Sequence, residues 1–284
     1  MRSVARSFSL LSALAVTGCG LAAPSSGEVV SDGVGTAIFE VRARSTDVVS
    51  VQVFYPSDDS GRAVGGRHPA FVFVQGGFVG VDRYEWLGER LARAGYVVAL
   101  PRHVLDLAFF AVENGEEARQ LLVAPPAGSL LVEQVDEARI AVGGHSLGGV
   151  VATKLALLGG YQALVLEASY PDSADVKALA GFSQPSLSLA GGNDCSAPLE
   201  KVQSGWNHLP TPTALSVMAG VTHYQFTDSD REDVQRGCAS GVSLEEAHER
   251  IAASVQGFLD AVNADAGVGE GALRAVPGAE VTVR

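Results

Sequence analysis

The sequence predicts an α/β fold, a mostly parallel twisted sheet covered by helices on both faces. Two observations lead to this prediction. Short apolar runs, typical of buried strands, alternate along the chain with longer segments that carry apolar residues at helical spacing. One run leads into a serine flanked by glycines, Gly144-His145-Ser146-Leu147-Gly148, and a helical pattern follows it directly. In sheets of this class the functional site lies at the carboxyl ends of the strands.

Eight short segments are expected to form strands. Continuous apolar runs such as Ala70–Gln75 are typical of strands that are covered on both faces of a sheet. The first two segments are candidates for an antiparallel pair. The expected strands are Ala37–Arg44, Val48–Tyr55, Ala70–Gln75, Tyr96–Pro101, Arg139–Gly143, Ala163–Glu167, Ser186–Ala190 and Ala214–Ala219.

Four segments are expected to form helices. The last opens with a capping box, Ser243 to Glu246, and continues with an apolar stripe at helical spacing. The segment Leu147–Leu158 is apolar almost all round, so this helix should be buried. In chain order the four are Asp82–Ala94, Asn114–Leu122, Leu147–Leu158 and Ser243–Val262.

The amino terminus resembles an export signal. Arg2 and Arg6 supply positive charge, and the apolar run Phe8–Val16 follows them. This run is about half as long as the roughly 20 residues that a membrane-spanning helix needs. It ends at Val16-Thr17-Gly18-Cys19, which resembles the box at which bacterial lipoproteins are cleaved and acylated. We expect residues 1–18 to be a lipoprotein signal peptide and Cys19 to carry a lipid. An ordinary signal peptide, with Cys19 near the cut by coincidence, is the alternative.

Composition restricts the function classes. The chain has 284 residues, 47% hydrophobic and 18% charged, as in globular proteins. Its formal net charge of −12 excludes the basic footprint of a nucleic-acid-binding protein. No His/Cys cluster has zinc spacing and no glycine-rich loop matches a phosphate-binding pattern, so we expect no metal and no cofactor.

After the signal we expect a flexible tether over 19–35, one catalytic domain over 36–264 and a C-terminal tail over 265–284.

The serine turn is the strongest motif. A serine between a strand and a helix must turn sharply, in strained backbone geometry, to project its hydroxyl above the sheet. Gly144 and Gly148, two residues either side of Ser146, remove side chains that would collide in such a turn. The amino terminus of the following helix favours a developing negative charge. Ser146 is therefore the candidate nucleophile, and a glycine-rich turn with a solvated serine is the alternative.

A nucleophilic serine needs a base, and the base needs an orienting carboxylate. Of the six histidines, His223 is the candidate base, because its loop follows the last expected strand and precedes the final helix. His145 lies inside the serine turn and is interpreted as structural. Asp194 follows the strand Ser186–Ala190 and is the candidate acid, with Glu167 as its rival. Ser146 would then attack an acyl carbon while His223 takes and returns the proton.

Two N–H groups should stabilise the oxyanion that forms. One is the backbone N–H of Leu147, directly after the nucleophile. The other should come from the loop Gly76-Gly77-Phe78-Val79-Gly80, where we favour the N–H of Phe78, with Gly77 as the neighbouring option. A plain glycine turn between strand and helix is the alternative.

Several of these segments together carry a family resemblance. They are His68-Pro69 with Gly76-Gly77-Phe78, the serine turn, Asn193-Asp194-Cys195-Ser196-Ala197-Pro198 and Val221-Thr222-His223-Tyr224-Gln225-Phe226. From about Ala37 to Ala264 the chain resembles the α/β-hydrolase fold, specifically the group of dienelactone hydrolases, chlorophyllases and cutinase-like polyester hydrolases. The chain order Ser146, Asp194, His223 is the order found in that fold.

The resemblance also carries details. Asp-Cys-x-Ala-Pro and His-x-x-Phe are similar to chlorophyllase-like sequences, in which a later cysteine (here Cys238) recurs. The cutinase-like enzymes usually have Met where Leu147 stands, and a Trp in the region where Tyr170 stands. Tyr170 could flank an acyl or aromatic group, or simply pack. If Cys19 is acylated, Cys195 and Cys238 remain as a pair that an oxidising compartment allows to bond. Two buried free thiols are the alternative.

These inferences predict a serine esterase that cleaves carboxylic esters, small or polymeric, through an acyl-enzyme intermediate. The lipid would hold it at the cell envelope, on the periplasmic or the cell-surface face. The alternatives are a lactone or dienelactone hydrolase, an acyltransferase with the same triad, or a non-catalytic lipoprotein that keeps the fold as a binding module.

Overall fold

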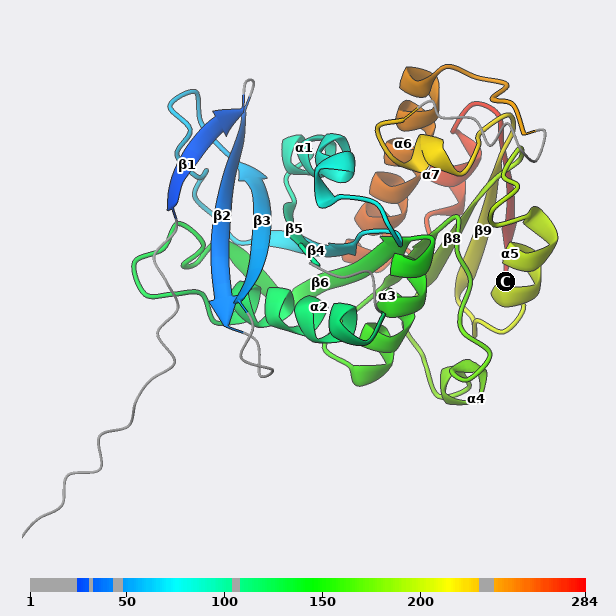
Figure 1. Ribbon diagram of the computed structural model, residues 1–284, viewed down its shortest axis with the longest axis horizontal. Helices are drawn as coiled ribbons and strands as arrows, with labels where there is room; N and C mark the ends of the chain where they lie inside the picture. The colour runs from blue at the N-terminus through cyan, green and yellow to red at the C-terminus, as the bar shows by residue number, and fades with distance from the viewer. Residues whose placement is uncertain (1–24, 31–32, 43–47, 104–107, 230–237) are drawn as a thin grey trace, which may run out of the picture.

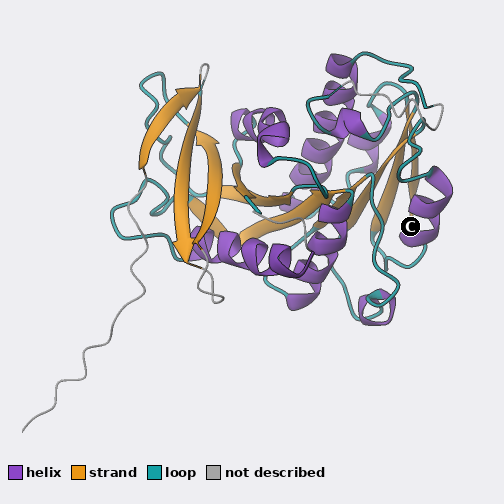
Figure 2. Ribbon diagram, in the orientation of Figure 1, coloured by secondary structure: helices purple, strands orange, loops and turns teal. Residues whose placement is uncertain are grey.

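The chain forms one sheet with helices packed against both of its faces (Figures 1 and 2). The computed structural model describes residues 25–30, 33–42, 48–103, 108–229 and 238–284. The expected signal peptide and the expected lipid attachment point, Cys19, lie outside the described residues. No helix in the described ranges has both the length and the apolar character needed to cross a membrane.

Six neighbouring strands in the middle of the sheet run parallel to one another. Most of their side chains are buried, as the apolar runs in the sequence predict. The predicted fold class is thereby confirmed. In sheet order the six strands are β5 (Val97–Pro101), β4 (His68–Val74), β6 (Val135–His145), β7 (Leu164–Glu167), β8 (Ser186–Gly191) and β9 (Thr213–Met218).

Antiparallel strands extend the sheet at both ends. At one end lie β3 (Val48–Pro56), β2 (Val34–Arg42) and β1 (Ser25–Val30), with β3 beside β5. The predicted antiparallel pair of β2 and β3 is confirmed. At the other end β10 (Ala279–Val283) pairs with β9.

The long helices divide between the two faces. Figure 1 shows α1 (Glu85–Arg93) and α6 (Leu244–Asn263) on one side of the sheet and α2 (Ala108–Val123) and α3 (Leu147–Leu158) on the other. The capping box of α6 forms as predicted, since Ser243 Oγ accepts a hydrogen bond from Glu246 N at 3.1 Å. The short helices are η1 (Val81–Tyr84), α4 (Val176–Leu179), α5 (Leu199–Trp206), η2 (Tyr224–Phe226) and α7 (Glu270–Arg274).

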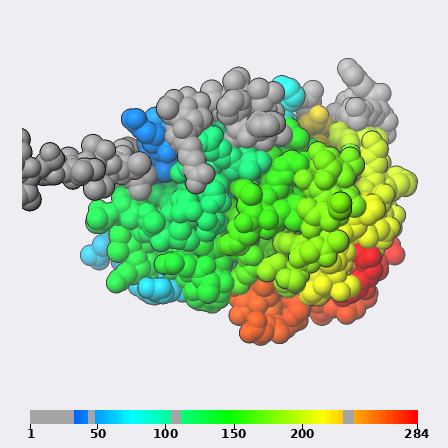
Figure 3. Space-filling view, turned by 90° about the horizontal axis from the view of Figure 1, so that it is seen from below, coloured from blue at the N-terminus to red at the C-terminus, as the bar shows by residue number. Residues whose placement is uncertain are grey.

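The structure corrects both expected flanks of the domain. Part of the expected tether, residues 25–30, is strand β1, which pairs with β2. The expected C-terminal tail contains α7 and β10, and Leu273 and Val281 within it are buried. Their apolar side chains gain more from packing on the sheet than from solvent exposure. Seen from below in Figure 3, green atoms of the middle of the chain form much of the face, and yellow to red atoms of the later segments lie at one end of it.

Candidate active site

Ser146 lies in a strained turn between β6 and α3. Its backbone has φ 53° and ψ −121°, a conformation that side chains with a Cβ rarely adopt. A Cβ on Gly144 would collide with the backbone of Gly148, and one on Gly148 would collide with the carbonyl of Val74. The turn therefore needs glycine on both sides of the serine, as the motif predicts. The Ser169 hydroxyl donates to the Ser146 carbonyl at 2.6 Å and braces the turn.

His223 and Asp194 meet as a hydrogen-bonded pair. His223 follows β9, Asp194 follows β8, and His223 Nδ1 lies 2.8 Å from Asp194 Oδ2. The other carboxylate oxygen, Oδ1, accepts from the backbone N–H groups of Ser196 and Ala197, each at 2.7 Å. Both side chains are mostly buried. Three hydrogen bonds thus fix the carboxylate, and it in turn fixes the orientation of the imidazole.

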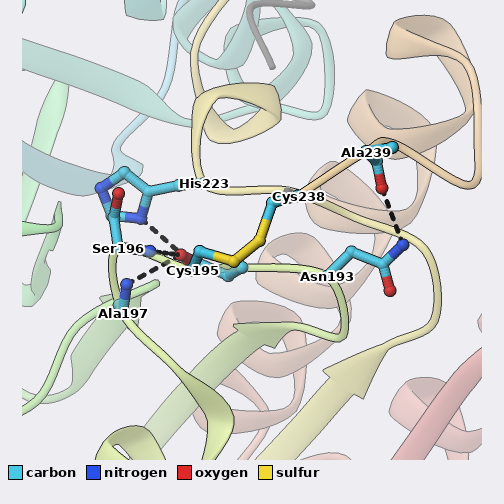
Figure 4. The surroundings of a disulfide bond; sticks show 8 residues. Asn193, Cys195, Ser196, Ala197, His223, Cys238 and Ala239 are labelled. Atoms are coloured by element: carbon cyan, nitrogen blue, oxygen red, sulfur yellow. Dashed lines mark hydrogen bonds and ion pairs between the residues drawn. A yellow bond between two sulfur atoms is a disulfide. The ribbon is translucent and has the colours of Figure 1, made fainter. Parts of the chain in front are cut away.

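A disulfide joins the two loops that carry this pair (Figure 4). The predicted bond between Cys195 and Cys238 is present, with the two Cα atoms 6.1 Å apart and 43 residues apart in sequence. Beside it Asn193 Nδ2 donates to the Ala239 carbonyl at 2.8 Å. Cys195, the residue after Asp194, is therefore covalently bonded to the segment that follows His223.

The expected oxyanion loop packs against the serine turn. A Cβ on Gly77 would lie 3.2 Å from Leu147 Cδ2, and the two residues line one small cavity. Phe78 has φ 58° and its side chain is 93% exposed. Among the described residues, none accepts a hydrogen bond from the Phe78 N–H. The loop that carries Phe78 therefore adjoins the amino terminus of α3, which begins at Leu147.

Glu167, the rival acid, makes no such pair with the histidine. It ends β7 and its side chain is 0% exposed. Neither carboxyl oxygen has a hydrogen-bond partner within the described ranges. Burial raises the pKa of Glu167 from 4.5 to about 8. A buried carboxyl without a partner is held neutral, so it does not supply the charge that an orienting acid provides.

Tyr170 and Leu147 line one groove. The groove has a volume of about 520 Å³ and lies between α3, α5 and the loop before α4. A Cβ on Gly205 would collide with the Tyr170 Cβ, so this tyrosine packs closely against α5. Tyr170 therefore both packs against α5 and borders the groove. This position is compatible with both interpretations from the sequence, a packing residue and a residue that flanks the substrate.

Sequence reasoning missed Tyr84. Its buried hydroxyl lies 2.9 Å from both Gly76 N and His145 Nδ1, directly behind the serine turn and the expected oxyanion loop. Tyr84 and His145 are 61 residues apart, and no local pattern in the sequence marks the tyrosine.

The strand order, the glycine-flanked serine turn and the buried His–Asp pair together define the architecture of a hydrolase built on a parallel sheet. Residues 70–242, more than half of the chain, match the alpha/beta hydrolase family, and the protein belongs to that family. The matched region includes Ser146, Asp194 and His223. A comparison with curated proteins found no match.

Proposed function

We propose that this alpha/beta hydrolase is a serine esterase that cleaves carboxylic esters with Ser146, His223 and Asp194. One observation carries the proposal: the buried 2.8 Å hydrogen bond between His223 Nδ1 and Asp194 Oδ2, in loops that follow neighbouring strands. Since Nδ1 is engaged by the carboxylate, Nε2 is the ring nitrogen left for proton transfer. The strained turn that carries Ser146 supports this serine as the nucleophile.

The chemistry has two balanced halves. Ser146 Oγ attacks the acyl carbon as His223 Nε2 takes the hydroxyl proton, and the N–H groups of Leu147 and Phe78 stabilise the oxyanion. The C–O bond to the alcohol then breaks, and the alcohol leaves with the proton from His223. Water attacks the acyl-serine in the same way, the proton returns to Ser146, and the carboxylic acid is released.

Hydrolysis of p-nitrophenyl acetate and butyrate tests the proposal. We expect Ser146→Ala to lower kcat by about 10⁴-fold or more, since loss of a nucleophile removes the covalent path. Ser183→Ala, a change at an exposed serine before β8, is the matched control and should turn over as the wild type does. A fluorophosphonate should label Ser146. Absence of turnover above the Ser146→Ala level, together with absence of labelling, would sink the esterase proposal.

The substrate class within the family is a separate proposal. We propose, from the resemblance to chlorophyllases, dienelactone hydrolases and cutinase-like enzymes, that the alcohol or acyl part of the ester is extended and occupies the groove beside Tyr170. An ester panel of increasing acyl length, with a lactone and a polyester film, tests this. Equal kcat/KM for acetate and longer esters would contradict an extended subsite.

We further propose that Cys19 is acylated and holds the enzyme at the cell envelope. The support is the lipoprotein-like box Val16-Thr17-Gly18-Cys19 after a short apolar run. In cells that express the full chain and are fed an alkyne-bearing fatty acid, the processed protein should become labelled and sediment with membranes. Cys19→Ala should abolish the label, and equal labelling of that variant would refute the anchor.

A further inference from the structure

One buried oxygen joins the expected oxyanion loop to the serine turn. Tyr84 is the last residue of η1 and is fully buried. Its hydroxyl oxygen lies 2.9 Å from the backbone N of Gly76 and 2.9 Å from His145 Nδ1. Gly76 begins the loop that presents Phe78, and His145 is the residue before Ser146. The two halves of the proposed site are therefore connected through a single side chain.

The directions of these hydrogen bonds follow from the atoms involved. The Gly76 N–H can only donate, so the Tyr84 oxygen accepts there, and its own hydrogen is left for His145 Nδ1. No other acceptor for that hydrogen is found within the described residues, so His145 Nδ1 is assigned as the acceptor and the proton of the neutral imidazole is assigned to Nε2. Burial acts in the same sense, since it raises the pKa of Tyr84 and holds the pKa of His145 well below its usual range.

His145 also packs directly under the proposed base. Its ring centroid lies 4.6 Å from that of His223, and its ring stacks on Phe226 at 5.7 Å with an interplanar angle of 12°. A positive charge on His145 would oppose the imidazolium that His223 forms during the reaction. The hydrogen bond from Tyr84 favours the neutral ring of His145. It therefore keeps a positive charge away from His223 when that imidazolium forms.

Space around the hydroxyl is filled. A Cβ on Gly76 would lie 2.9 Å from His145 Nδ1 and 3.0 Å from the Tyr84 hydroxyl. The loop can approach this closely only because residue 76 has no side chain. The close packing of Gly76 against Tyr84 and His145 thus fixes the position of the oxyanion loop relative to the turn that carries Ser146.

We propose that Tyr84 and His145 are positioning residues of this hydrolase, whose hydrogen-bond chain Gly76 N–H to Tyr84 O–H to His145 Nδ1 sets the oxyanion loop against the nucleophile. The proposal rests on the proposed function. Neither residue is assigned a contact with the substrate; both act through the N–H groups of Phe78 and Leu147 and through the ring of His223.

Tyr84→Phe tests the proposal, because it removes one oxygen and leaves the ring packed on Phe73 and His145. For p-nitrophenyl acetate we expect kcat to fall about 10- to 100-fold, less than the roughly 100- to 1,000-fold cost of deleting an oxyanion donor. KM should change little, since ground-state binding is untouched. The rate of fluorophosphonate labelling should fall in parallel, because phosphonylation also places a negative oxygen in the oxyanion hole.

Tyr96→Phe is the matched control. Tyr96 is also buried, and its hydroxyl donates to Asp260 at 2.6 Å and accepts from Asn263 at 3.0 Å. It precedes β5, at the amino edge of the parallel strands and so away from the site. We expect this variant to retain wild-type kcat. Thermal unfolding of both variants separates lost stability from lost positioning.

A second pair of variants tests the acceptor at His145. The amide oxygen of His145→Asn lies near the place of Nδ1 and can still accept from Tyr84, whereas His145→Leu cannot. We expect Asn to retain at least tenfold more kcat than Leu. Three outcomes would overturn the inference and leave the esterase proposal intact. They are a wild-type kcat in Tyr84→Phe, a loss of kcat in Tyr96→Phe equal to that in Tyr84→Phe, and an equal kcat in His145→Asn and His145→Leu. A wild-type protein without turnover or labelling would overturn the proposed function and this inference together.

Discussion

Three residues that carry side chains have positive φ at the carboxyl edge of the sheet. They are Phe78 (58°), Ser146 (53°) and Ala168 (45°), and they follow β4, β6 and β7. Such conformations cost about 1–3 kcal/mol each and persist only where the surrounding structure enforces them. All three strained residues lie at one edge of the sheet, so the fold accepts a cost in stability there to hold a particular backbone geometry. Two of them are the proposed nucleophile and a residue of the oxyanion loop.

Glu167 gives a stability prediction at the same edge. Its folded pKa of about 8 lies above the ordinary 4.5, so the folded state holds the proton more tightly than the unfolded chain. The contribution of Glu167 to stability is therefore intact below pH 4.5 and is lost as the pH rises to about 8. At roughly 1.4 kcal/mol per pH unit, the loss is on the order of 5 kcal/mol.

The measurement is urea unfolding of the wild type and Glu167→Gln at several pH values. Glutamine keeps the shape of the neutral carboxyl but does not ionise. We expect the difference in unfolding free energy between the two proteins to grow steadily in favour of the variant from pH 4.5 to 8 and then to level off. A difference that stays constant over this range would show that Glu167 is not held neutral.

Among the elements, β10 gives a prediction because its two faces differ. Val281 is buried, while Thr282 beside it is exposed, and the strand pairs along its length with β9, the strand before the His223 loop. Val281→Asp would place a charge in the core, so we expect it to lower the unfolding free energy by about 3 kcal/mol or more. Thr282→Asp should change it by less than about 0.5 kcal/mol. Equal effects in urea unfolding would contradict the burial of Val281.

Elements were predictable from sequence where a local pattern is strong. The helix α3 has the predicted bounds, because a strained turn starts it and Gly159 ends it. The capping box at Ser243 marks the start of α6 in the same way. By contrast β10 has only five residues, in which Ala279, Val281 and Val283 alternate with polar residues. This short alternation indicates a strand only once it is known that one edge of β9 is not paired with β8.

The helix α5 shows a signal that could have been used. Pro198 precedes it, and Leu199, Val202 and Trp206 stand at helical spacing. For the candidate site, the serine motif pointed to Ser146, and the positions of Asp194 and His223 after expected strands pointed to the other two, since the carboxyl ends of parallel strands meet at one edge of the sheet. Tyr84 could not be found in this way, because only tertiary packing brings η1 beneath the turn.

On the scale of the whole molecule, the disulfide links the two loops on which the proposed chemistry depends. Cys195 follows Asp194 directly, and Cys238 lies beyond His223, so the bond closes a loop of 43 residues that contains His223 and begins directly after Asp194. On the chain-entropy account a loop of this length is worth about 3–4 kcal/mol of stability. Its position also limits how far the two loops can separate in the folded state.

The double variant Cys195→Ser/Cys238→Ser should therefore show two losses with different origins. Its melting temperature should fall by about 10 °C, since each 1 kcal/mol shifts a domain of this size by roughly 2–4 °C. At a temperature where it remains folded, kcat should also fall, because the Asp194–His223 geometry is then held by hydrogen bonds alone. The wild type treated with reductant should match the variant, while Cys19→Ser, which keeps the pair, should match the untreated wild type. A lower melting temperature with unchanged kcat would mean that the bond stabilises the fold without holding the proposed site together.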